Sequence, residues 1–142
     1  QKCPQVWTIE FLSKVTENLN SQGYLITYSS SAAVRKTLRN LGLEIFTIKP
    51  SFKNRTFWSQ GTVAIAKFDK NKFKPNLNFE KLSVMEEEHL LTKAGIPYRD
   101  QNLNSSKDDI IKQRLKEQLL SNLVPTKKWR EKWGMTKLAF KS

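Results

Sequence analysis

Apolar residues recur every three to four positions near the start of the chain, from Val6 to Leu19. This spacing places them on one face of a helix, and Pro4 suits its first turn. Gly23 is a typical helix stop. The pattern therefore predicts one amphipathic helix at the amino-terminal end.

The next segments alternate between strand-like and helix-like patterns. An apolar, β-prone run at 24–28 predicts a strand that is buried on both faces. Further spacing and turn signals predict a helix over 32–41 and strands over 43–48 and 62–68. The order helix, strand, helix, strand, strand is typical of an α/β sheet with a hairpin at its far edge.

The composition changes after residue 68. Residues 69–82 contain Lys, Asn and Pro with little periodicity, which predicts a linker between a first unit, 1–68, and a helical tail, 83–142. In the tail, Ser83 with Glu86 forms a capping-box pattern, and Ser106 with Asp109 opens another helix. That second helix has a leucine stripe suited to docking, and Thr126 caps a last short helix.

The charge is strongly positive: 25 Lys and Arg against 13 acidic residues give a formal net charge of +12. This excess favours a polyanionic partner, and we favour nucleic acid over a solvated, Lys-rich surface. No apolar run approaches the roughly 20 residues that cross a bilayer, so we expect no membrane partner. Cys3 and His89 are the single cysteine and histidine, too few for a structural metal site and typical of a reducing, cytoplasmic compartment.

Several stretches resemble one family, the MnmC-like S-adenosylmethionine-dependent tRNA methyltransferases. The opening Gln-Lys-Cys-Pro-Gln-Val-Trp-Thr at 1–8 is similar to the stretch after the family's acidic Asp-x-Phe-Ser/Ala-Pro turn, and the strand at 25–29 and the helix at 33–42 are similar too. Residues 88–100, Glu-His-Leu-Leu-Thr-Lys-Ala-Gly-Ile-Pro-Tyr-Arg-Asp, resemble a signature of the shorter, single-domain members. The resemblance implies the second half of a Rossmann-like class I methyltransferase sheet with a helical carboxyl-terminal tail.

The resemblance also implies a function. These enzymes transfer a methyl group from S-adenosylmethionine to the aminomethyl group of a wobble uridine, so tRNA is the expected partner. The family's Gly-rich loop, its ribose-binding acid and its catalytic Asp all precede the region that matches residue 1, and no G-x-G pattern occurs here. We therefore expect no catalytic residue in this chain and no cofactor binding by it alone. We also expect a homodimer, or the missing amino-terminal half, to pair across the strand at 24–29.

The candidate site residues form two groups. Cleft residues are expected at the carboxyl ends of the parallel strands and at the chain start; they are Lys2, Trp7, Tyr28, Ser29 and Ser30. Cations and aromatic rings that suit phosphates and unstacked bases form the RNA-binding group; they are Lys49, Lys53, Arg55, Trp58, Arg99, Lys127, Lys128 and Arg130.

Structural roles compete with these assignments. The serines also suit a helix cap, Trp7 and Tyr28 also suit a core, and residues 49–61 also suit an edge hairpin with inward aromatics. For Arg99 we favour a salt bridge that holds the tail; for Trp129 and Trp133 we favour the core, and we expect His89 at the surface. Two other functions remain open: an RNA-binding module without chemistry, and an oxidoreductase acting on a CH–NH group.

Overall fold

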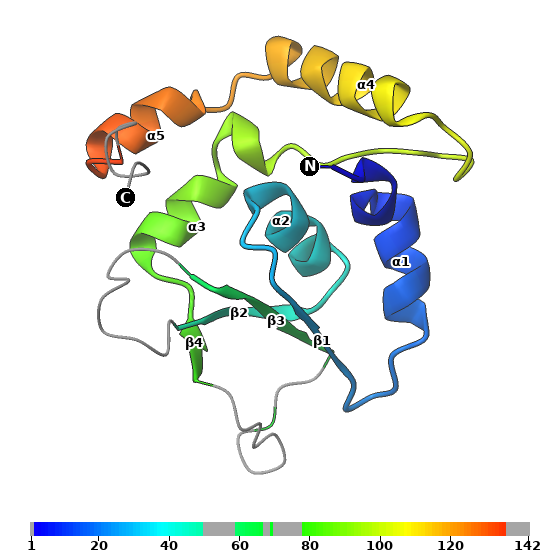
Figure 1. The fold of residues 1–142 in the computed structure, drawn as a ribbon. Helices are drawn as coiled ribbons and strands as arrows, with labels where there is room; N and C mark the ends of the chain where they lie inside the picture. Colours follow the sequence, from blue (N-terminus) through cyan, green and yellow to red (C-terminus); the bar gives the residue numbers. More distant parts are fainter. Residues whose placement is uncertain (1, 50–58, 67–68, 70–77, 136–142) are drawn as a thin grey trace.

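The fold is a four-stranded sheet with helices over one face (Figure 1). It is known from a computed structural model that describes residues 2–49, 59–66, 69 and 78–135. The strands are β1 (Tyr24–Thr27), β2 (Glu44–Ile48), β3 (Gly61–Ile65) and β4 (Phe79–Lys81). They follow the order β1-β3-β2-β4, and every neighbouring pair is antiparallel. Because β3 lies antiparallel between β1 and β2, those two strands run parallel to each other and end at the same edge.

This arrangement confirms the predicted helix-strand-helix-strand-strand order. The first helix is divided: a 3-10 turn, η1 (Pro4–Trp7), precedes α1 (Ile9–Glu17). Thr8 separates the two because its backbone is extended and its side chain accepts a hydrogen bond from the N–H of Phe11, which caps α1. The predicted second helix is α2 (Ala32–Asn40), and Gly42 follows it at a positive φ of 92°.

Two sequence predictions about the sheet are wrong. Residues 24–28 were expected to be buried on both faces, but Tyr24 is 49% and Ile26 45% exposed. The reason is that β1 ends the sheet in the described part of the chain, and only its Leu25 face packs on the helices. Residues 69–82 were expected to form a linker, but Phe79–Lys81 pair with β2 as the fourth strand.

The main core lies between the sheet and helices α1, α2 and α3 (Val84–Leu90). It is built from apolar residues of all these elements: Leu12, Ala32, Val34, Leu38, Leu43, Ile45, Ala64, Leu82 and Leu90. A second cluster on the other face contains Phe46, Val63 and Ile65. The rings of Phe46 and Phe79 pack edge to face, with their centroids 5.3 Å apart. The sheet is therefore buried on both sides at its centre, and exposed at β1.

The helical tail packs over α2 and α3 (Figure 1). It contains η2 (Lys93–Gly95), α4 (Lys107–Leu120) and α5 (Thr126–Lys132). The predicted capping box of Ser83 and Glu86 and the predicted cap of Ser106 are both present. In the part of the chain that the structure describes, no helix has the length and apolar content needed to span a bilayer.

Helix α4 does not dock through the leucine stripe that the sequence indicated. Ile110 is buried, but Leu115, Leu119 and Leu120 are 53%, 80% and 76% exposed. The helix is held instead by polar side chains that reach main-chain carbonyls of the preceding segment. Arg114 donates to the carbonyls of residues 96 and 94 at 2.7 and 2.9 Å, and Gln118 donates to that of residue 93 at 2.8 Å. The carbonyl of residue 93 also accepts from the N–H of Ile96, which closes the 3-10 turn, so Gln118 adds a second bond to it.

Helix α5 docks through Trp129, as the sequence predicted, whereas Trp133, for which a core position was also favoured, is 37% exposed. Trp129 is 4% exposed, and its indole N–H donates to the carbonyl of Met85 at 2.9 Å. Its ring stacks on His89 with centroids 4.0 Å apart and planes 13° apart. The expectation that His89 lies at the surface is therefore wrong: the ring is partly buried because α5 covers it.

The burial of His89 predicts a pH-dependent stability. Burial, followed by the nearby charges of Arg35 and Arg130, lowers the pKa of His89 from 6.5 to about 4, and the charge of Glu86 offsets only part of this change. An unfolded chain therefore binds a proton between pH 6.5 and about 4 that the folded chain does not, so stability is lost as pH falls through this window. We expect a loss of about 1 to 2 kcal/mol after allowing for partial exposure of the ring.

The measurement is urea unfolding of the chain and of His89→Phe at several pH values. Phe keeps a ring against Trp129 but has no proton to bind, so its unfolding free energy should fall less steeply than that of the wild-type chain between pH 6.5 and 4.5, where the remaining slope comes from carboxylates such as Glu86. Equal slopes for the two proteins in this window would contradict the assignment.

Candidate functional site

The carboxyl ends of β1 and β2 lie at one edge of the sheet and carry the predicted cleft residues. Tyr28 follows β1 directly and is 96% exposed, so it is a surface residue and not part of the core. Ser29 and Ser30 come next and are partly buried. Lys49 follows β2 and is exposed. At this edge of the sheet the exposed ring of Tyr28 therefore lies beside polar residues.

The serines hold the turn between β1 and α2. The N–H of Ser29 donates to the hydroxyl of Thr27 at 3.1 Å, and the N–H of Ser31 donates to the hydroxyl of Ser29 at 3.3 Å. Ser31 is the residue before α2, but its side chain makes no capping hydrogen bond. The hydroxyl of Ser29 thus fixes the turn itself. We call residues 28–31 the cleft turn.

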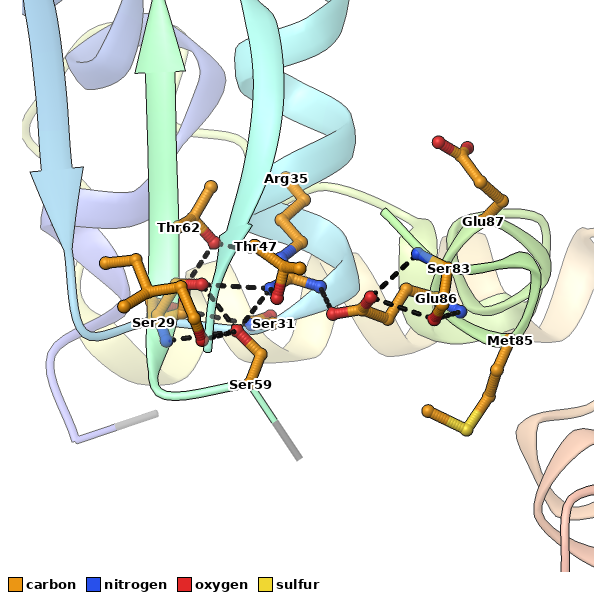
Figure 2. A network of polar contacts seen from close by, with 12 residues as sticks. Ser29, Ser31, Arg35, Thr47, Ser59, Thr62, Ser83, Met85, Glu86 and Glu87 are labelled. Carbon is orange, nitrogen blue, oxygen red and sulfur yellow. Dashed lines mark hydrogen bonds and ion pairs between the residues drawn. The ribbon is translucent and has the colours of Figure 1, made fainter. Parts of the chain in front are cut away.

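Behind the cleft turn lies a buried arginine (Figure 2). Arg35 belongs to the first turn of α2, is 2% exposed, and points across the end of the sheet. Its guanidinium donates to Glu86 at 2.8 Å on one side and to the hydroxyl of Thr62 at 2.9 Å on the other. It also donates to the hydroxyls of Thr47 and Ser59 and to the carbonyl of Gly61, at 3.2, 2.8 and 3.0 Å. One side chain thereby connects α2, β2, β3 and α3.

Close backbone packing supports this arrangement at Gly61. A Cβ at this position would lie 2.3 Å from the carbonyl oxygen of Thr27 on β1, which is too close for any side chain. Glycine therefore allows β3 to approach the end of β1, and it brings its own carbonyl to Arg35.

The ionisation of the Arg35–Glu86 pair follows from its contacts. Burial by itself would raise the pKa of Glu86, but hydrogen bonds from the backbone of Ser83 and from Arg35 hold it below 4.5. Burial lowers the pKa of Arg35 below its usual value, and Glu86 opposes this change. Both groups are charged at neutral pH, and the pair has no buried polar side-chain atom without a partner among the described residues.

The other predicted cleft residues have different surroundings. Trp7 is partly buried and packs on both core clusters that contain α2 residues, which supports the core role left open for it. Lys2 is exposed on the segment before η1. Of the two predicted cleft aromatics, Tyr28 is therefore exposed to solvent and Trp7 packs against the core.

The predicted RNA-binding cations lie on several elements. Lys49 pairs with Glu80 at 2.6 Å. Arg99 pairs with Glu117 of α4 at 3.3 Å, so its salt bridge lies within the tail, whereas the sequence favoured one that joins the tail to the first unit. On α5, Lys127 is 3.8 Å from Glu131, and Lys128 and Arg130 are exposed. Lys53, Arg55 and Trp58 lie outside the described residues. The described cations of this group are thus concentrated on α5, where they are exposed on either side of the buried Trp129 in the sequence.

Sequence reasoning missed Arg35 and Thr62 as members of the site. A weak signal was present: Arg35 falls among the apolar residues of α2, and Thr62 and Thr47 fall within apolar strands. A polar group in an apolar stripe indicates a buried partner, but it does not identify that partner. The pairing of Arg35 with Glu86, 51 positions away, has no sequence signal.

Comparison with known proteins gives one family. Residues 1–64 match a family model described as S-adenosyl-L-methionine-dependent methyltransferase. An uncharacterized protein from Methanocaldococcus jannaschii is 33% identical over 123 residues, which are 82% of this chain and 32% of that protein. The crystal structure of MNMC2 from Aquifex aeolicus is similar with a TM-score of 0.66 and 28% identity, over 82% of this chain and 34% of that one.

The chain therefore spans about a third of the length of the relatives that it matches. The match to MNMC2 includes the tail as well as the sheet, because 82% coverage extends well beyond residue 64. The order of strands and helices, the family model and this structural similarity agree with one another. Residues 1–64 thus match the S-adenosyl-L-methionine-dependent methyltransferase family, and the fold of the chain is that of an MnmC-like methyltransferase.

Proposed function

We propose that this chain is part of a tRNA-modifying enzyme that transfers a methyl group from S-adenosylmethionine to the aminomethyl group of a wobble uridine. The observation that carries the proposal is the structural similarity to MNMC2 over sheet and tail together. The net charge of +12 and the exposed cations of α5 suit a tRNA substrate. The exposed ring of Tyr28 suits an unstacked base at the cleft.

The residues described here do not by themselves fit S-adenosylmethionine. The family implies this cofactor, but the segments that follow β1 and β2 carry Tyr28, serines and Lys49 and no carboxylate for a ribose. We therefore assign this chain one side of the cleft. Its residues position the substrate amine and exclude water, and alignment of a neutral amine is the main requirement of such a transfer.

The test is methyl transfer by the protein extended through the residues that its gene encodes upstream of Gln1. We expect labelled methyl groups from S-adenosylmethionine to enter tRNA that carries an aminomethyl wobble uridine, and not the same tRNA with an unmodified uridine. The 142-residue chain alone should neither catalyse this reaction nor bind the cofactor in a titration. Tight RNA binding by the extended protein without methyl transfer would favour the alternative, an RNA-binding module without chemistry.

Helix α5 provides a separate prediction about RNA. Neutralised phosphates release counterions, so affinity falls with salt in proportion to the number of contacts, with a slope of about 0.7 to 0.9 per phosphate. Replacement of Lys128 and Arg130 by Ala should weaken tRNA binding and reduce the slope of log Kd against log salt by about 1.5. The control removes the same charge from α1 and β4 by Lys14→Ala with Lys81→Ala. Equal effects of the two double variants would mean that only net charge matters.

We also propose that the outer edge of β1 pairs with another strand, from a second copy or from the upstream half. In the described part of the chain β1 has a strand neighbour on one side only, and it lacks the Lys or Pro that protects a natural edge. Ile26 remains 45% exposed on it. The proposal therefore predicts that this chain self-associates in solution.

Sedimentation of the 142-residue chain tests this prediction. Ile26→Lys places a charge on the edge strand and should shift the chain to monomer. Leu119→Lys places the same charge on α4, where the side chain is 80% exposed, and should leave association unchanged. A monomeric wild-type chain, or dissociation by Leu119→Lys alone, would contradict pairing through β1.

A further inference from the structure

A buried hydroxyl connects Arg35 to the cleft turn. The Nε–H of Arg35 donates to Thr62 Oγ1 at 2.9 Å, and Thr62 Oγ1 donates to the carbonyl oxygen of Ser29 at 2.7 Å. Thr62 is fully buried and Arg35 is 2% exposed, so the bond between these two side chains is shielded from water, and the bond to Ser29 is part-buried. The connection runs from α2 through β3 to the turn that precedes α2 in the chain.

The direction of these hydrogen bonds is fixed by chemistry. A guanidinium has donors and no acceptor, so the oxygen of Thr62 must accept from Arg35. The single hydroxyl proton of Thr62 is then directed to the carbonyl of Ser29. A positive charge at the start of such a chain polarises the hydroxyl and strengthens the second bond.

Two local hydrogen bonds also hold the cleft turn. Its backbone is held by the side chains of Thr27 and Ser29, at 3.1 and 3.3 Å, both within the turn or next to it. The bond from Thr62 reaches the turn from across the sheet, 33 positions away in the sequence. Tyr28 precedes Ser29 directly, so a bond that holds the Ser29 carbonyl also restrains the backbone from which the exposed ring of Tyr28 projects.

We propose that Thr62, oriented by Arg35, is the positioning residue for the cleft turn and, through it, for the substrate that Tyr28 meets. This inference rests on the proposed methyl transfer for its functional part, and on the geometry alone for its structural part. Neither side chain touches substrate. Their role is to hold Tyr28–Ser31 in the one arrangement that aligns the amine.

Thr62→Val tests the proposal, because Val keeps the shape of Thr and removes only the hydroxyl. Thr47→Val is the matched control: Thr47 is also a buried strand threonine that accepts from Arg35, at 3.2 Å, but it has no bond to the cleft turn. Thr62→Ser keeps the hydroxyl and should restore wild-type behaviour. All three variants are made in the protein extended upstream of Gln1, with folding checked by urea unfolding.

The first readout does not depend on activity. Amide hydrogen exchange at Ser29 and Ser31 should speed up by about tenfold or more in Thr62→Val and stay within about twofold in Thr47→Val and Thr62→Ser. Equal exchange at the turn in Thr62→Val and Thr47→Val would overturn the structural part, whether or not the protein transfers methyl groups.

The second readout is the split between kcat and KM. A loosened turn misaligns the bound substrate, so Thr62→Val should lower kcat by about 10- to 100-fold with KM for tRNA within about threefold. Thr47→Val should stay within about twofold in both. If the wild-type protein is active and Thr62→Val shows faster amide hydrogen exchange at the cleft turn with an unchanged kcat, the positioning role is refuted. A wild-type protein without any methyl transfer would refute the proposed function, and the exchange result would then decide the structural part alone.

Discussion

The fold depends on the burial of one positive charge. Arg35 is almost fully removed from water, and a bare guanidinium in that position would cost several kcal/mol. The cost is offset because Glu86 supplies the opposite charge and because hydroxyl and carbonyl oxygens of four further residues surround the remaining donors. Removal of Glu86 alone would leave the charge unmatched, a change that typically costs about 3 to 5 kcal/mol. The partners of Arg35 therefore have to be in place together.

This requirement explains why the tail belongs to the same unit as the sheet. Glu86 lies in the first turn of α3, where the capping box with Ser83 fixes its carboxylate. An ion pair between Arg39 and Glu87, with bonds of 2.7 and 2.8 Å, joins the same two helices at the surface. Helix α5 then packs on α3 through Trp129, and α4 is held by carbonyls of residues 93–96. The position of the tail therefore depends on the ion pair between the buried Arg35 of α2 and Glu86 of α3.

The same charge links structure to function at the edge of the sheet. The carboxyl ends of β1 and β2 meet there because β3 lies antiparallel between them. Backbone at this edge is polar, and the nearby serines, threonines and Gly61 direct their oxygen atoms toward Arg35 or toward one another. A rigid edge with one exposed aromatic ring, Tyr28, is a suitable wall for a substrate that must be aligned rather than covalently attacked.

Local sequence determined the elements and much of their order. Periodicity, glycine stops and capping residues act over three or four positions, so α2, α3, β1 and β2 and the capping box at Ser83 were predictable. The order of several short stretches along the chain, each similar to a segment of the same family, also indicated the family. These signals are local, or depend on the succession of short motifs along the chain.

Only the tertiary structure decided which surfaces meet. β4 was missed because a three-residue strand has no period of its own and forms only where the free edge of β2 accepts it. The leucine stripe of α4 indicated apolar docking, yet Arg114 and Gln118 hold the helix, since the carbonyls near η2 that accept their hydrogen bonds were not visible in the sequence. His89 is covered by Trp129, 40 positions later, and Arg35 meets Glu86 across 51. Such partners are chosen by long-range packing, which sequence spacing does not encode.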